Sequence, residues 1–299
     1  MDVKEHIKKL KAERNAVILA HYYQSLEVQD VADQVGDSYA LAKMAQSARQ
    51  EVIVLCGVRF MAESAKILNP DKTVYLPASA AGCPMADMIE PDDVIKLREQ
   101  YPDAAVVCYV NSSAAVKAVS DICCTSSSAE RIVRSLPQRQ VIFVPDQNLG
   151  SYVAKLVPDK EIILFPGYCP THHRIAAADA ETARNEHPNA KILAHPECRE
   201  EVLEYADYIG STAGILEQAC NSKEKELIIG TEMGIVEILQ RKLPDKRIYS
   251  LKSALICPNM KKTKLEHIER CLEGKADPVE LTAEEMEGAR LSLERMVSV

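Results

Sequence analysis

Three cysteines occupy equivalent places in an internal repeat, and each is followed by proline. Successive cysteines are 86 and 88 residues apart, and a Pro-Asp-Lys tripeptide lies upstream of each one. The three pairs are Cys83-Pro84, Cys169-Pro170 and Cys257-Pro258. A fixed period of this kind indicates a repeated structural unit. One thiolate from each of three repeats is the ligand set that a single three-thiolate site at a pseudo-threefold centre requires.

A three-thiolate site favours an iron–sulfur cluster over zinc. Iron–sulfur clusters normally have four cysteine ligands, so three would leave one iron of a 4Fe-4S cluster open to water or substrate. An open iron is a Lewis acid that polarises a hydroxyl or carbonyl oxygen, so dehydration or condensation is expected. Structural zinc usually takes four protein ligands, often from CxxC pairs, and the sequence has no CxxC. The alternative is that triplication copied small, inert residues at a turn.

A second set of repeated residues lies upstream of the cysteines. Three short apolar runs end in an imidazole or a phenol, and a hydroxyl side chain follows seventeen residues after each. The pairs are His21 and Ser38, Tyr109 and Ser126, and His195 and Thr212, and each hydroxyl residue is expected to open a helix. Ligands bind beyond the carboxyl ends of parallel strands, where a helix N-terminus offers free N–H groups to an anion. One such hydroxyl is usually a helix N-cap, but three predict a small substrate with several negative groups.

The segment His195-Pro196-Glu197-Cys198 carries a carboxylate just past a predicted strand end. We expect Glu197 to act as a general base or acid; the alternative is a solvated glutamate at the start of a helix. This segment could also form a zinc site with His172 and His173, because the ligand types suit that metal. The zinc site is disfavoured, because His195 already has a place in the threefold pattern.

The elements that must position these residues follow the same order in each repeat. Continuous apolar strands, expected at 17–20 and 52–55 and their equivalents, alternate with helices. Such strands are typical of a parallel sheet covered on both faces. The predicted fold class is α/β, with three homologous three-layer αβα domains around a pseudo-threefold axis. The predicted domains span 1–86, 87–172 and 173–262, with C-terminal helices from 263–299 packing on the first.

The composition excludes several classes of function. The chain has 47% hydrophobic and 27% charged residues, a net charge of −8, and no basic run that would suggest nucleic-acid binding. No apolar run approaches the ~20 residues of a membrane span, and residues 1–11 predict an amphipathic helix, not a signal peptide. We therefore expect a cytoplasmic protein with no membrane or nucleic-acid partner. The remaining cysteines are expected to be small buried residues: Cys56, Cys108, Cys123, Cys124, Cys198, Cys220 and Cys271.

Along essentially its whole length the chain closely resembles quinolinate synthase, the A protein of NAD biosynthesis. The residues that carry the resemblance are Ala20-His21-Tyr22-Tyr23-Gln24, Gly36-Asp37-Ser38, Tyr109-Val110-Asn111-Ser112, Cys124-Thr125-Ser126, His195-Pro196-Glu197-Cys198 and Gly210-Ser211-Thr212. The resemblance implies condensation of iminoaspartate with dihydroxyacetone phosphate to quinolinate, with release of phosphate and two waters. It also implies a 4Fe-4S cluster with one open iron, and functional coupling to an aspartate-oxidising enzyme.

The resemblance also implies roles for single residues. The implied cluster ligands are Cys83, Cys169 and Cys257, and the implied catalytic residues are Tyr23, Glu197 and His195. The implied substrate contacts are His21, Ser38, Tyr109, Val110, Asn111, Ser126, His172, His195, Pro196, Glu197, Ser211 and Thr212. Longer relatives carry extra cysteines around the third ligand. The segment Cys257-Pro258-Asn259-Met260 has only one, so no redox switch is expected there.

Two rival functions remain open from the residues alone. One is another hydro-lyase of the aconitase type, with an open iron and a hydroxy-acid substrate, which would release no phosphate. The other is an iron–sulfur or zinc sensor without turnover. A sensor needs an interaction surface such as a basic patch or a pair of DNA-binding helices, and the sequence indicates none.

Overall fold

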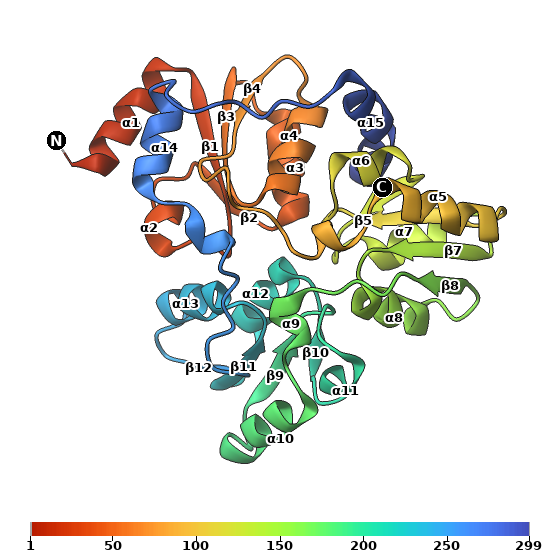
Figure 1. Cartoon of the computed structure of the whole chain (residues 1–299). Helices are drawn as coiled ribbons and strands as arrows, with labels where there is room; N and C mark the ends of the chain where they lie inside the picture. Colours follow the sequence, from red (N-terminus) through yellow and green to blue (C-terminus); the bar gives the residue numbers. More distant parts are fainter. Residues whose placement is uncertain (1, 299) are drawn as a thin grey trace.

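The computed structural model describes residues 2–298 and contains three parallel four-stranded sheets. Their strand orders are β2-β1-β3-β4, β6-β5-β7-β8 and β10-β9-β11-β12, which is the same topology three times. Figure 1 shows the three sheets as separate lobes around a common centre. The predicted α/β fold class with three αβα units is therefore confirmed.

The strands follow the predicted apolar runs. The first sheet contains β1 Ala16–His21, β2 Gln34–Gly36, β3 Val52–Cys56 and β4 Thr73–Tyr75; the second contains β5 Ala105–Tyr109, β6 Ile122–Cys124, β7 Gln140–Val144 and β8 Glu161–Leu164; the third contains β9 Lys191–Ala194, β10 Tyr208–Ile209, β11 Glu226–Gly230 and β12 Arg247–Ser250. The central strands β1, β3 and β5 are buried along their whole length. Burial on both faces explains why they have no polar alternation.

Each repeat has the same order of helices. Helices α1 Val3–Glu13, α5 Pro91–Gln100 and α10 Ala177–Glu186 precede the first strand; α2 Leu26–Gln29, α6 Ala114–Ala118 and α11 Glu200–Leu203 precede the second; α3 Ser38–Ser47, α7 Ala129–Ser135 and α12 Thr212–Asn221 precede the third; and α4 Arg59–Leu68, α8 Gln147–Leu156 and α13 Met233–Lys242 precede the fourth. Helices α5 and α10 end just before Pro102 and Pro188, because proline cannot continue a helix. Every helix within 2–298 is too short or too polar to cross a bilayer.

A short helix follows each of the three repeated cysteines, and two longer helices lie at the C-terminal end of the chain. The short ones are η1 Ala86–Met88, α9 Pro170–His173 and η2 Met260–Lys262, so the predicted domain boundaries at 86/87 and 172/173 fall inside η1 and α9. Helix α14 (Leu265–Leu272) packs against α1 and β3, which both belong to the first repeat. Helix α15 (Ala283–Ser298) packs against α6 and β6 of the second repeat and also against α4. It therefore links two repeats.

Alternate residues of a strand face opposite layers of the sandwich. In β1, Val17 and Leu19 belong to a large buried cluster that extends into all three repeats. Ile18 and Ala20 belong to a second cluster, closed by Ile7 of α1 and by residues of α14. This two-residue period is the one that a pleated strand imposes. The shared cluster means that the three repeats bury one another's apolar surface.

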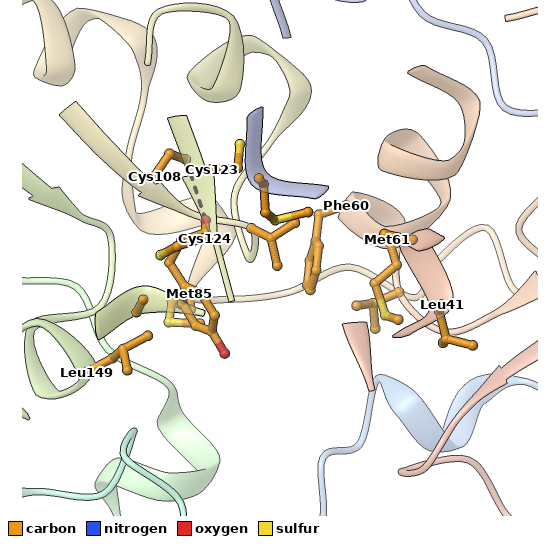
Figure 2. Close-up of a cluster of buried hydrophobic side chains, with 14 of the residues drawn as sticks. Leu41, Phe60, Met61, Met85, Cys108, Cys123, Cys124 and Leu149 are labelled. Carbon is orange, nitrogen blue, oxygen red and sulfur yellow. Dashed lines mark hydrogen bonds between the residues drawn. The ribbon is translucent and has the colours of Figure 1, made fainter. Parts of the chain in front are cut away.

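The cysteines outside the threefold pattern lie mostly in these cores. Figure 2 shows Cys108, Cys123 and Cys124 in the same buried cluster as Phe60 and Met61 of α4. Cys56, Cys198 and Cys271 are also buried. The prediction was wrong for Cys220, which is exposed near the end of α12.

Candidate active site

Strand ends from all three sheets meet at one cavity of about 160 Å³. His21 ends β1, Tyr109 ends β5, and His195 directly follows β9. These are equivalent positions, because the carboxyl ends of parallel strands share an edge of their sheet. The sequence-predicted residues on the wall are His21, Tyr23, Ser38, Tyr109, Asn111, Ser126, His172, His195, Glu197 and Thr212.

Cys83, Cys169 and Cys257 line the same cavity, one from each repeat. Burial raises the pKa of the Cys83 thiol to about 12, and it also raises the pKa values of Cys169 and Cys257. In the protein alone these sulfurs are therefore protonated at neutral pH. A bound metal would have to displace the protons, as metal binding to thiols generally does.

The imidazoles of His21 and His195 are held in the same way. The Nδ1 atom of His21 accepts a hydrogen bond from the N–H of Tyr23 at 3.1 Å, and Nδ1 of His195 accepts one from the N–H of Glu197 at 3.3 Å. A neutral ring that accepts at Nδ1 carries its proton on Nε2. Burial lowers the pKa of His21 to about 3 and that of His195 to about 4. Both rings are therefore neutral hydrogen-bond donors at physiological pH.

Glu197 lies at the centre of a buried polar network. The phenol of Tyr109 donates a hydrogen bond to Oε1 of Glu197 at 2.6 Å, and Nδ1 of His172 lies 2.7 Å from Oε2. Burial alone would raise the pKa of this carboxyl, but His195, His172 and the two hydrogen bonds together lower it below its usual range. Glu197 is therefore an ionised carboxylate although its side chain is buried. It can accept a proton from a bound substrate.

Tyr23 reaches from the first repeat into the third. Its hydroxyl lies 3.0 Å from Oγ1 of Thr212 and 2.8 Å from Oγ1 of Thr231. Burial raises the pKa of the Tyr23 phenol well above its usual value, with the Glu197 charge as a second cause. Gly234 permits this approach, because a Cβ there would lie 2.8 Å from the carbonyl oxygen of Tyr22.

His172 joins the carboxylate network to the cysteines. Its Nε2 lies 2.8 Å from Oγ1 of Thr231, and its Nδ1 lies 3.2 Å from Sγ of Cys169. Its ring also stacks on His195, with the centroids 4.8 Å apart. Ligand atoms of Cys169, His172 and Glu197 all lie within 4.8 Å of one another and could hold a metal ion. The disfavoured zinc set, the segment 195–198 with His172 and His173, shares His172 and Glu197 with this group but did not include Cys169.

The three repeated hydroxyls do not occupy equivalent helix positions. Ser38 and Thr212 are the first residues of α3 and α12, whose N-caps are Asp37 and Ser211. Helix α7 begins only at Ala129, so the expectation that Ser126 opens a helix was wrong. The reason is a local turn, in which the N–H of Thr125 donates to Oγ of Ser128.

Three residues expected to contact substrate do not line the cavity. Val110 and Pro196 are buried beside it, and Ser211 caps α12 by accepting a hydrogen bond from the N–H of Gly214. By contrast, Oδ1 of Asn111 is buried on the wall without a hydrogen-bond partner among the described residues. A buried oxygen of this kind is costly unless a ligand donates to it.

Sequence reasoning missed Thr231, which is fully buried and links Tyr23 to His172. Its one sequence signal is its place directly after β11, the third strand of its repeat. The corresponding residues in the first two repeats are Gly57 and Pro145, which offer no hydroxyl. The repeat pattern could therefore not reveal it.

The family model that matches this chain and the known proteins that resemble it all point to one family. The sequence model of the family described as Quinolinate synthetase A protein matches residues 5–298. The chain is 52% identical to the quinolinate synthase of Caldicellulosiruptor bescii over 99% of this chain and 98% of that protein. It is 52% identical to quinolinate synthase 2 of Methanosarcina acetivorans, covering 99% and 96%, and 48% identical to the quinolinate synthase of Clostridioides difficile, covering 99% and 97%.

The neutral imidazoles predict a specific acid sensitivity of the cluster-free protein. The pKa of His21 is about 3 in the folded state and 6.5 in an ordinary chain, so between these values only the unfolded state takes up the proton. Stability is therefore retained above pH 6.5 and lost as the pH falls towards 3. We expect this histidine to account for about 2 kcal/mol of lost unfolding free energy between pH 7 and pH 5.

The measurement is chemical denaturation of the cluster-free protein at several pH values. His21→Gln should flatten the dependence on pH, because glutamine does not titrate. His267→Gln, at a half-buried position outside the cavity, is the control, and its unfolding free energy should depend on pH as in the parent. If the unfolding free energy of His21→Gln falls with pH as steeply as that of the parent, the result would contradict a buried, neutral His21.

Proposed function

The chain belongs to the quinolinate synthetase A family and is thus an enzyme of NAD biosynthesis, and we propose that it condenses iminoaspartate with dihydroxyacetone phosphate to quinolinate. Phosphate and two waters leave in this reaction. The observation that carries the proposal is the shared cavity, where three cysteines, an ionised Glu197 and two neutral imidazoles face one space. This set suits proton transfer and loss of hydroxyl from a small anionic substrate.

Cys83, Cys169 and Cys257 are proposed as the ligands of a 4Fe-4S cluster. The donor set fits, since three sulfurs from three repeats line one cavity and the described wall holds no fourth cysteine. When bound, the cluster would supply one open iron as a Lewis acid toward a hydroxyl or carbonyl oxygen. His172, beside Cys169, would then lie between the ligand shell and Glu197.

The substrate's negative groups are proposed to bind at the helix starts. Helices α3 and α12 begin at the wall with Ser38 and Thr212, at the positive end of each helix dipole. Asp37, on the same wall, already accepts a hydrogen bond from the N–H of Ala40, so the substrate would use the other groups at these helix starts. The Oδ1 atom of Asn111, which has no partner among the described residues, would accept a hydrogen bond from an amine or hydroxyl of the substrate. Phosphate and carboxylate groups can thus be bound in a protein of net negative charge.

Proton transfer is proposed to use Glu197 and Tyr23. Glu197 is ionised and serves as the base, and the hydrogen bond from Tyr109 fixes its orientation. The pKa of Tyr23 is raised mainly by burial, so its phenol stays protonated and can donate to an oxygen of an intermediate. His195, neutral and facing the cavity, is proposed to orient the substrate through Nε2.

A cytoplasmic location and functional coupling to an aspartate-oxidising enzyme are also proposed, on the family resemblance. The domain boundaries at 86/87 and 172/173 remain predictions.

Replacing any one of the three wall cysteines by serine should abolish the cluster, because two thiolates rarely retain it. Iron and sulfide content after anaerobic reconstitution is the measurement. Cys220→Ser is the matched control, because Cys220 is exposed on α12, and it should keep full iron content. Full iron in all three wall variants would remove the basis of the cluster assignment.

Glu197→Gln should slow quinolinate formation at least about 100-fold, since general acid–base groups typically contribute 10²–10⁴-fold. Glutamine keeps the shape and the hydrogen bond from Tyr109 but cannot take the proton. The assay is quinolinate formed per cluster under strict anaerobiosis, with iminoaspartate generated in situ. The control is Glu201→Gln, a surface carboxylate paired with Arg199. Turnover near the parent rate with a full cluster would assign Glu197 a structural role.

A further inference from the structure

Each cysteine loop is tied to the start of a helix in its own repeat. The first N–H of α4, α8 and α13 donates to a carbonyl two residues before the cysteine. The three bonds are Arg59 to Ala81 at 2.8 Å, Gln147 to Gly167 at 2.8 Å, and Met233 to Leu255 at 2.7 Å. The repeat thus fixes the approach of each loop to the cavity through one backbone contact.

In the second repeat a buried carboxyl group adds a contact to the cysteine itself. Asp146 is fully buried and is the N-cap of α8. Its Oδ1 accepts from the N–H groups of Asn148 and Leu149 at 2.8 and 2.9 Å, and its Oδ2 accepts from the N–H of Cys169 at 3.2 Å. One oxygen therefore caps the helix while the other holds the cysteine backbone.

The third repeat has the same arrangement, built with a longer side chain. Glu232 is fully buried and is the N-cap of α13. Its Oε2 accepts from the N–H of Gly234 at 2.7 Å, and its Oε1 accepts from the N–H of Cys257 at 3.3 Å. Lys261 lies 3.2 Å from the same Oε1 atom. Two different acidic residues thus make the same pair of contacts.

Helix capping alone does not explain these two side chains. Serine or threonine caps a helix well without a carboxyl group, and a buried carboxyl is costly unless its oxygens are hydrogen-bonded. In the first repeat the N-cap of α4 is Val58, an apolar residue, so this helix forms without any side-chain cap. What Asp146 and Glu232 add is the second oxygen, which the cysteine N–H uses.

We propose that Asp146 and Glu232 are positioning residues, which hold the backbones of Cys169 and Cys257 so that both sulfurs are oriented for the cluster. This inference rests on the proposed function, because it concerns the ligands of that cluster. Groups that orient metal ligands typically change metal affinity or activity 10–100-fold when they are mutated.

The test uses Asp146→Asn and Glu232→Gln in the full-length reconstituted protein. Each amide keeps one oxygen for the helix cap but turns an NH₂ group toward the N–H of the cysteine, where two donors meet. We expect the cluster to be lost to an iron(II) chelator about 10–100-fold faster than from the parent. The decay of the cluster absorbance under anaerobic conditions gives the rate. Two opposed donors also cost stability, so the thermal midpoint of each cluster-free variant is measured first, and cluster loss is followed at a temperature where that variant is fully folded.

The matched control is Glu63→Gln. Glu63 is also a buried carboxyl group that accepts a backbone N–H, from Ala114 at 3.1 Å, but it does not line the cavity. It should lose the cluster at the parent rate. Asp146→Ser is a second variant if Asp146→Asn does not fold, because serine caps the helix but is too short to reach Cys169 as well. It should show the same rapid loss.

The outcomes distinguish failure of this inference from failure of the proposed function on which it rests. A parent protein that binds no cluster overturns the proposed function and this inference together. A parent with a stable cluster, and folded Asp146 and Glu232 variants that lose it no faster than Glu63→Gln, overturns this inference alone. Loss that is faster only in the Asp146 and Glu232 variants supports it.

Discussion

The convergence of three parallel-sheet edges on one cavity is the constraint on which the rest of the structure depends. A unit of about 86 residues buries its own surface poorly, and here one apolar cluster extends through all three repeats. In this packing the carboxyl ends of the strands face one another. Residues such as His21, Tyr109 and His195, about 90 positions apart in sequence, then meet in one space. Function is therefore a property of the assembly and not of a single repeat.

Burial sets the protonation states in that space. The same desolvation lowers the pKa values of His21 and His195 and raises those of the phenols and the cysteine thiols. Glu197 is the exception, because a phenol and two imidazoles surround its carboxylate. The result is an ionised base beside neutral donors, an arrangement that can move a proton at neutral pH.

The strands, the sheet type and the meeting of the cysteines could be predicted from apolar runs and a fixed period. Individual side-chain contacts between repeats could not be predicted, because they depend on how the repeats pack. Thr231 contacts Tyr23 and His172, yet its counterparts Gly57 and Pro145 give no warning. Ser126 was misplaced because a turn closed by Ser128 delays helix α7. Cys220 was misjudged because the exposed face of α12 follows from how that helix packs, not from residue type.

The central claim is that three thiolates from three repeats hold one cluster with one iron free for substrate. Mössbauer spectroscopy of the ⁵⁷Fe-reconstituted protein, with and without a substrate, tests it most directly. The account predicts a 4Fe-4S signal in which one iron of four changes its parameters when substrate binds, while the other three do not. Four irons that stay equivalent and unaffected by substrate, or no cubane signal at all, would contradict it.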